Sequence, residues 1–219
     1  MWGFPHNGMM PRISATERVA TRRRLIEAAK AEFAARGLAG ARFDEISLSA
    51  GHAKGTIYNY FDSKERLFLT VVEDWCGLLA DAAHSIQAAS ARDRVLEIAA
   101  IDVEIARKDP DLARVVVLHM PALVGSDREA TWSAVEPGLN LLEVEFARGL
   151  KRGEFLSRQS APALARLFFG NLSAFELEAL QPEALISLDD VVELLDRHFM
   201  AGLDASSVLN QAAYEQEQT

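Results

Sequence analysis

Apolar residues recur at intervals of three and four along almost the whole chain, which is the period of an amphipathic helix. The first such run holds Ile26, Ala29 and Phe33, and Gly37 follows where a helix would end. No run alternates between apolar and polar residues as a half-buried strand would. Helices are therefore predicted around residues 26–37, over 43–50 and 54–61, from 62 to about 86, over 92–107, from 109 onward, up to about 152, from 160 to 175 and over 188–199. The predicted fold class is all-α.

Short signals mark the ends of several predicted helices. Asp62 and Glu65 have the spacing of a capping box and open the long fourth helix. Asp109 is a predicted N-cap, because a proline, favoured at the first helical position, follows it. Pro137 either starts or kinks the helix that runs to about residue 152.

Charge is unevenly distributed over the 219 residues. Residues 12–66 carry 11 Lys and Arg against 7 Asp and Glu, whereas residues 67–219 carry 12 against 25. A basic segment on an acidic chain is typical of contact with a polyanion through that segment. The single cysteine, Cys76, excludes an internal disulfide framework, and no apolar run reaches the length of a membrane span. A cytoplasmic protein is expected.

The basic segment contains the stretch GHAKGTIYNYFDSKERLF, residues 51–68. A short glycine turn between the helices 43–50 and 54–61 predicts a helix-turn-helix, whose second helix lies in the DNA major groove. Small residues open that second helix, where a backbone can approach base edges closely. Asn59 can pair with adenine, and Ile57 and Phe61 form the opposite, apolar face. Lys64 stands in the first turn of the next helix, where a phosphate is favoured.

The stretch AGHAKGTIYNYFDSKERL is similar to the signature of TetR-type transcriptional regulators, A-G-V-S-K-G-T-L-Y-x-Y-F-x-S-K-E-x-L. LIEAAKAEFAARG and DEISLSAG also resemble the first two helices of that family, so the resemblance covers about residues 17–70. It implies the following DNA-contacting positions: Lys54, Gly55, Thr56, Tyr58 and Asn59 in the groove, and Tyr60 and Lys64 on phosphates. The sequence departs from the signature at His52 and Ala53, which stand in place of a turn hydrophobe and a helix cap. Arg42, in place of a cap, is expected to reach a phosphate.

The resemblance also implies a domain plan. A disordered arm is expected over residues 1–15, a DNA-binding domain over 16–62, a ligand-binding and dimerisation domain over 63–205, and a flexible tail over 206–219. Candidates for a ligand cavity are Trp75, Leu79, His119, Met120, Trp132, Phe146 and Phe169, with core packing as the alternative for each. Candidates for a homodimer interface of the last two long helices are Leu164, Phe168, Leu172, Phe175, Leu188, Val192, Leu195 and Phe199. Asp102, Glu143 and Glu145 are expected to be solvated, although a carboxylate that faced a cavity would favour a cationic ligand.

The expected function is that of a sequence-specific repressor, which binds a palindromic operator in double-stranded DNA and is released by a small-molecule effector. A DNA-binding protein without an effector, architectural or controlled by a protein partner, is the first alternative. A helical-bundle enzyme is the second, but Asp81-Ala-Ala-His84 is its lone carboxylate-x-x-His element, and the common catalytic motifs are missing from the sequence. We therefore predict no enzymatic activity, cofactor, metal site or membrane contact.

Overall fold

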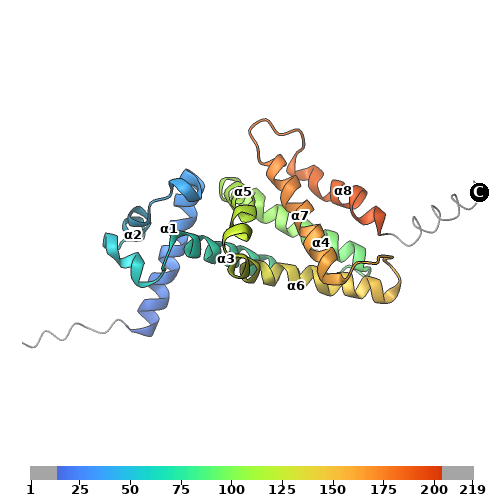
Figure 1. Ribbon diagram of the computed structural model, residues 1–219, viewed down its shortest axis with the longest axis horizontal. Coiled ribbons are helices and arrows are strands. Elements are labelled where there is room, and N and C mark those ends of the chain that lie inside the picture. Colours follow the sequence, from blue (N-terminus) through green and yellow to red (C-terminus); the bar gives the residue numbers. More distant parts are fainter. Residues whose placement is uncertain (1–13, 204–219) are drawn as a thin grey trace, which may run out of the picture.

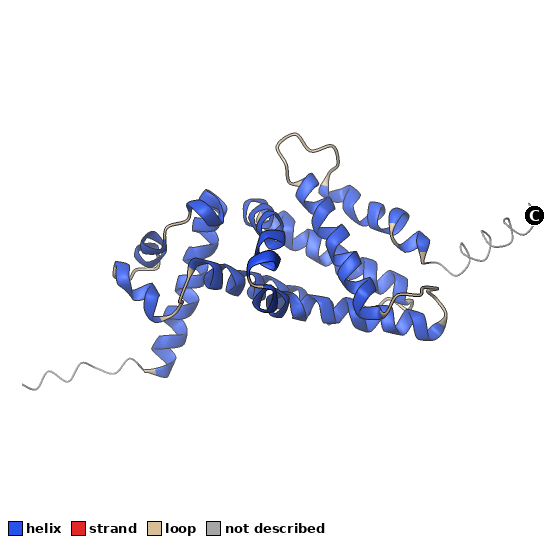
Figure 2. Cartoon of the chain, viewed as in Figure 1, coloured by secondary structure: helices blue, strands red, loops and turns tan. Residues whose placement is uncertain are grey.

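The computed structural model describes residues 14–203, and within that range all side chains except those of residues 121–126. The described part of the chain is helical and contains no strand, as Figure 2 shows. The elements are α1 (Ala15–Gly40), α2 (Phe43–Ser49), the 3-10 helix η1 (Lys54–Asn59), α3 (Lys64–Ala83), α4 (Ala91–Lys108), α5 (Pro110–Ser126), α6 (Arg128–Arg152), α7 (Ala161–Ala179), α8 (Leu188–His198) and the 3-10 turn η2 (Met200–Gly202). The all-α prediction is confirmed. Among these residues no helix has the length and apolar character needed to cross a membrane.

The predicted arm and tail lie largely outside the described residues. The exceptions in the arm are Ser14 and Ala15, which begin α1: the Ser14 hydroxyl accepts a hydrogen bond from the Glu17 backbone, and Glu17 bonds back to Ser14. This reciprocal pair satisfies two backbone donors that no helical carbonyl can reach.

Other helix ends follow their local signals, with one correction. Asp109 caps α5 as predicted, since its carboxylate accepts the Leu112 N–H at 3.1 Å. Pro137 lies inside α6 and does not start it. The predicted cap Asp62 is wrong: Ser63 is the N-cap of α3, and its hydroxyl accepts the Arg66 N–H. Both residues can cap a helix, so sequence spacing alone did not separate them.

The molecule has a small head and a larger helical body, and α3 runs from one into the other (Figure 1). In the head, α1, α2 and η1 pack on the start of α3 through buried residues that include Phe33, Ile46 and Ile57. The Phe33 and Phe68 rings meet edge to face, with centroids 5.3 Å apart. Because Phe68 belongs to α3, the helix that supports the head is the same one that enters the body.

The body is a bundle of α3 to α8 around a second apolar core. Phe146 is fully buried at its centre and contacts the rings of Phe155, Phe168 and Phe199. Gly149 allows this packing, since a Cβ there would lie 2.2 Å from the Phe155 ring. Phe146, a candidate ligand residue, is therefore part of the core, which is the alternative that the sequence analysis gave for it.

Candidate nucleic-acid interface and interior cavity

The turn between α2 and η1 is fixed by glycine and serine. Gly51 adopts a positive φ of 80°, a conformation that other residues avoid. Ser47 is fully buried, and its hydroxyl donates to the Ala53 carbonyl at 2.6 Å across the turn. Ala53 provides no side-chain cap for η1. The Ser47 hydroxyl, which lies on the α2 side of the turn, thus restrains the backbone just before η1.

The helix η1 presents one face to the head and one to solvent. Ile57 is fully buried and Phe61, just after the helix, is nearly so. The opposite face carries the predicted groove residues: Lys54, Gly55, Tyr58 and Asn59 are exposed, and Thr56 is half-buried. The Tyr58 ring rests edge-on against Phe43 of α2 at 5.1 Å between centroids, so its position is restrained although it is exposed. The structure therefore brings the predicted base-reading residues together on one surface.

Three predicted phosphate contacts have different surroundings. The Arg42 side chain is exposed and lies 3.6 Å from the Glu45 carboxylate. Tyr60 is half-buried under the Arg18 guanidinium, 5.5 Å from the ring centroid. Lys64 points inward, and its ammonium donates to the carbonyl oxygens of Ala39 at 2.9 Å and Ala41 at 3.3 Å. Lys64 thus ties the start of α3 to the end of α1, a role that its sequence position did not indicate.

An interior cavity lies in the body, enclosed by α3, α4, α5, α6 and α7. Its volume is about 40 Å³, well below the several hundred that a drug-sized ligand occupies. Of the predicted ligand residues, Trp75, Leu79, Met120 and Phe169 line it. The polar groups on its wall are Trp75, Cys76, Asp102, Ser173 and Glu176.

Two carboxyl groups in this wall are buried. Asp102 is 6% exposed and accepts the indole N–H of Trp75 at 2.7 Å, and burial raises its pKa to about 6. Glu176 is 3% exposed, and its Oε1 has no hydrogen-bond partner among the described residues. Burial, and then the nearby Asp102 carboxylate, raise the pKa of Glu176 well above its usual value. The expectation that Asp102 is solvated is wrong, because this face of α4 packs against the bundle.

Cys76 and Glu145 complete the set of buried ionisable groups near these helices. Burial, followed by repulsion from Asp102, raises the pKa of the Cys76 thiol to about 12, so it is not a nucleophile near neutral pH. Glu145, also expected to be solvated, is buried but paired: Arg94 Nε donates to its Oε1 at 2.9 Å, and Arg148 lies 3.2 Å away. Unlike Glu176, Glu145 therefore has its charge compensated inside the protein.

Residues 25–71 match the family model of bacterial regulatory proteins, tetR family. Over these residues the chain is similar to the N-terminal domain of the TetR family. The match covers α2, η1, the turn between them, most of α1 and the first part of α3.

Curated transcriptional regulators are also similar to a short stretch of this chain. The HTH-type transcriptional repressor SCO4008 of Streptomyces coelicolor is 46% identical over 61 residues, which cover 28% of this chain and 32% of that protein. The chain thus spans about a third of the length of the curated relatives it matches.

Solved structures extend the likeness to the whole fold. The transcriptional regulator FadR from Bacillus subtilis, in complex with stearoyl-CoA, has a TM-score of 0.68 at 22% identity and covers 79% of this chain and 96% of its own. A transcriptional regulator from Saccharomonospora viridis, in complex with choline, has a TM-score of 0.64 at 22% identity and covers 85% and 98%. These likenesses show that the chain shares with both structures a helical fold that extends beyond the head into the body.

Three predicted ligand residues lie away from the cavity, and one of them, Phe146, belongs to the core described above. His119 contacts the head instead: its ring meets Phe68 edge-on at 6.2 Å, and burial lowers its pKa. Trp132 lies under the Arg166 guanidinium, 4.8 Å from the ring centroid, beside a separate surface pocket. Residue type alone did not indicate whether each of these side chains lines the cavity, packs in the core or lies near the surface.

Four of the eight predicted dimer residues need correction, and the other four stay predictions. Leu164, Phe168, Leu172 and Leu195 are buried in the protomer's own core, so they cannot face a partner. Phe175, Leu188, Val192 and Phe199 are half-buried and pack against that same core. The solvent face of α7 instead carries Leu167, Gly170 and Ala174, with Leu167 53% exposed. Both rows have helical spacing, and only packing decides which one faces inward.

Glu176 is the feature that sequence reasoning missed. A signal was available, since Glu176 continues the four-residue spacing of Leu164, Phe168 and Leu172 on the buried face of α7. Burial of an acidic residue in register with an apolar row is costly unless its carboxyl group is hydrogen-bonded or paired with a positive charge.

Proposed function

We propose that this chain is a sequence-specific transcriptional repressor that binds a palindromic operator as a homodimer and is released by a small molecule in the interior cavity. The observation that carries the proposal is the exposed face of η1, where Lys54, Gly55, Thr56, Tyr58 and Asn59 gather opposite the buried Ile57. Such a face fits a major groove, with small residues where the backbone nears the bases. The name of the matched Streptomyces relative, a transcriptional repressor, supports the same function.

A homodimer follows from the geometry of operator reading. Two heads read two half-sites about 34 Å apart, one DNA turn, and their two-fold symmetry matches a palindrome. We propose that the partner covers the exposed face of α7 around Leu167, because its apolar row is unpartnered in the protomer.

Helix α3 supplies a physical link between the cavity and the head. Asp74 of α3 pairs with Lys30 of α1, which also lies 3.1 Å from Glu27. The next residue, Trp75, lines the cavity and bonds Asp102. A ligand shifts the head only if it binds one arrangement of α3 more tightly than the other. Two consecutive residues of α3, Asp74 and Trp75, thus contact the head and the cavity.

The test is selection of duplexes from a random-sequence DNA pool by the purified protein. We expect an enriched palindrome, with affinity that falls steeply as salt rises, since phosphate contacts release counterions. Replacing Asn59 by alanine is expected to relax base preference at one position of each half-site and to cost about 1 to 3 kcal/mol. Recovery of no preferred sequence, together with no salt-sensitive binding, would falsify the proposal.

A further inference from the structure

The interior cavity is an acidic site enclosed by apolar walls. Asp102 from α4 and Glu176 from α7 both face it, and no Lys, Arg or His among the described residues lines it. Two buried carboxyl groups without a cation nearby are unfavourable, because the protein interior solvates charge poorly. Glu176 Oε1 in addition lacks a hydrogen-bond donor. The site lacks one positive charge and at least one donor.

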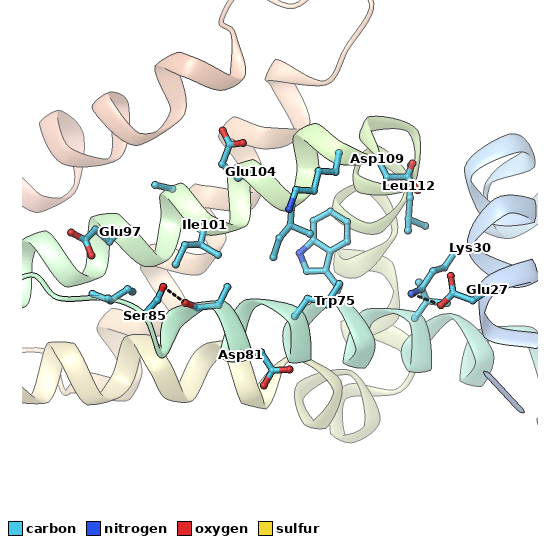
Figure 3. A pocket seen from close by; sticks show the side chains of 17 residues that line it. Glu27, Lys30, Trp75, Asp81, Ser85, Glu97, Ile101, Glu104, Asp109 and Leu112 are labelled. Atoms are coloured by element: carbon cyan, nitrogen blue, oxygen red, sulfur yellow. Dashed lines mark hydrogen bonds and ion pairs between the residues drawn. The ribbon is translucent and has the colours of Figure 1, made fainter. Parts of the chain in front are cut away.

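An open groove outside the cavity has the same electrostatic character. Its volume is about 840 Å³, and it lies between α1, α3, α4 and the start of α5 (Figure 3). Five carboxylates stand along it against two lysines, and one of these, Lys30, is already paired with Glu27 and Asp74. The carboxylates are those of Glu27, Asp81, Glu97, Glu104 and Asp109. A groove of this sign raises the local concentration of cations.

Trp75 lines both spaces. In Figure 3 its indole lies in the middle of the groove, between α3 and α4. Its N–H donates to Asp102, which lines the inner cavity. The groove floor beside it is apolar, with Ile101 and Leu112 on the wall. The inner cavity has room for little more than one ammonium group, so an alkyl body attached to that group needs space beyond it. Trp75 is the residue that the linings of the cavity and the groove share.

We propose that the effector is a protonated primary alkylamine, whose ammonium group lies between Asp102 and Glu176 and whose alkyl body extends past Trp75. The ammonium supplies the missing charge, and its three N–H donors serve Glu176 Oε1 and Asp102 together. This proposal rests on the proposed function, because a ligand is an effector only if it releases the protein from DNA. Binding of the amine itself is measurable without DNA.

The test uses n-butylamine, which is protonated at pH 7, and 1-butanol, its uncharged counterpart of similar size. Isothermal titration of the full chain is expected to show binding of butylammonium and none of butanol at the same concentrations. Because burial raises the pKa of both carboxyl groups, we expect the pair to hold a proton in the free protein and the cation to displace it. Cys76 is the other titratable group on the cavity wall, and its thiol stays protonated at this pH. Repeating the titration in buffers of different ionisation enthalpy should therefore reveal proton release.

Two variants locate the site. Glu176→Gln keeps the shape and removes the charge, so butylammonium affinity should fall at least about thirty-fold, as for other buried charge pairs that lose one member. Asp93→Asn is the matched control: it removes an exposed carboxylate on the same helix as Asp102 that lines neither the groove nor the cavity, and it is expected to change affinity less than about threefold. If the Glu176 variant does not fold, proton release by the unaltered chain decides.

Equal binding of butanol and butylammonium, absence of proton release, or loss of binding in Asp93→Asn with none in Glu176→Gln would each overturn the proposal. These outcomes are separate from failure of the proposed function. If butylammonium binds as described but the protein selects no operator, the ligand class stands and the repressor function does not. If uncharged compounds release a selected operator and amines do not bind, the reverse holds.

Discussion

The indole N–H of Trp75 in α3 donates to the Asp102 carboxylate in α4 at 2.7 Å, at the wall between the outer groove and the inner cavity. This bond joins the helix that supports the head to a helix of the body. It also stabilises a buried carboxylate, yet burial outweighs it, because the pKa of Asp102 is raised to about 6 and not lowered.

The raised pKa of Asp102 predicts a definite pH dependence of stability. An unfolded aspartate has a pKa of about 3.9, so between about pH 4 and 6 the folded state binds more protons than the unfolded state. The free energy of unfolding contributed by this group therefore declines as pH rises through this window, and the loss is complete above it. Asp102→Asn keeps an oxygen that can accept the indole N–H but cannot ionise. At pH 8 it should be more stable than the unaltered chain by on the order of 2 kcal/mol.

Urea unfolding followed by circular dichroism at pH 5 and pH 8 measures this difference. Glu97→Gln, an exposed carboxylate on the same helix, serves as the control and should not alter the pH dependence. Greater stabilisation by Asp102→Asn at pH 5 than at pH 8 would contradict the assignment.

Lys64 is expected to stabilise the head as well as affect DNA binding. Its ammonium donates to two carbonyls at the end of α1, and hydrogen bonds from a charged group contribute about 1.5 to 3 kcal/mol. Lys64→Met should lower the free energy of unfolding by about that amount and weaken DNA binding to all sequences alike. Arg42→Ala should weaken DNA binding and leave stability within about 0.5 kcal/mol, because Arg42 is exposed. Thermal unfolding and binding to a random duplex separate the two; equal stability of both variants would show that the Lys64 bonds are not needed.

Leu167 is expected to be needed for dimerisation. Its side chain is 53% exposed on α7, and a buried charge at the centre of an apolar interface is strongly unfavourable. Leu167→Glu should give a monomer at micromolar concentration in sedimentation equilibrium, with unchanged helix content. Leu118→Glu is the matched control, since Leu118 of α5 is 52% exposed and should leave the dimer intact. A dimer that survives Leu167→Glu would place the interface elsewhere.

Gly149 is expected to tolerate no side chain. A Cβ would lie 2.2 Å from the Phe155 ring, and Phe155 is buried against Phe146, so overpacking should cost about 1 to 3 kcal/mol on Gly149→Ala. Gly77→Ala in α3 is the control: a Cβ there meets nothing within 4 Å, so this change should stabilise by about 0.4 to 1 kcal/mol. Chemical denaturation compares them, and a loss of similar size in both variants would mean that the ring is not the cause.

The sequence by itself determined the helices, the cap at Asp109 and the helix-turn-helix. These features depend on residues a few positions apart, such as the positive φ at Gly51 and the cap at Asp109, and a local pattern contains all the information they need. The exposed face of η1 was likewise predictable, because Ile57 and Phe61 are four residues apart and leave one side for solvent.

Tertiary structure alone decided which of several equivalent faces is buried. On α7, the rows through Phe168 and through Leu167 both have helical spacing, and the first faces inward because α6 and α8 pack there. Tertiary structure also decided which buried carboxylates lie next to a positive charge. Asp102 and Glu145 look alike in sequence, but Glu145 meets two arginines, whereas Asp102 meets Glu176 from a helix more than seventy residues away. Contacts between residues far apart in the sequence decide which side chains are buried and which charged groups lie next to one another. Together these two outcomes create the acidic cavity.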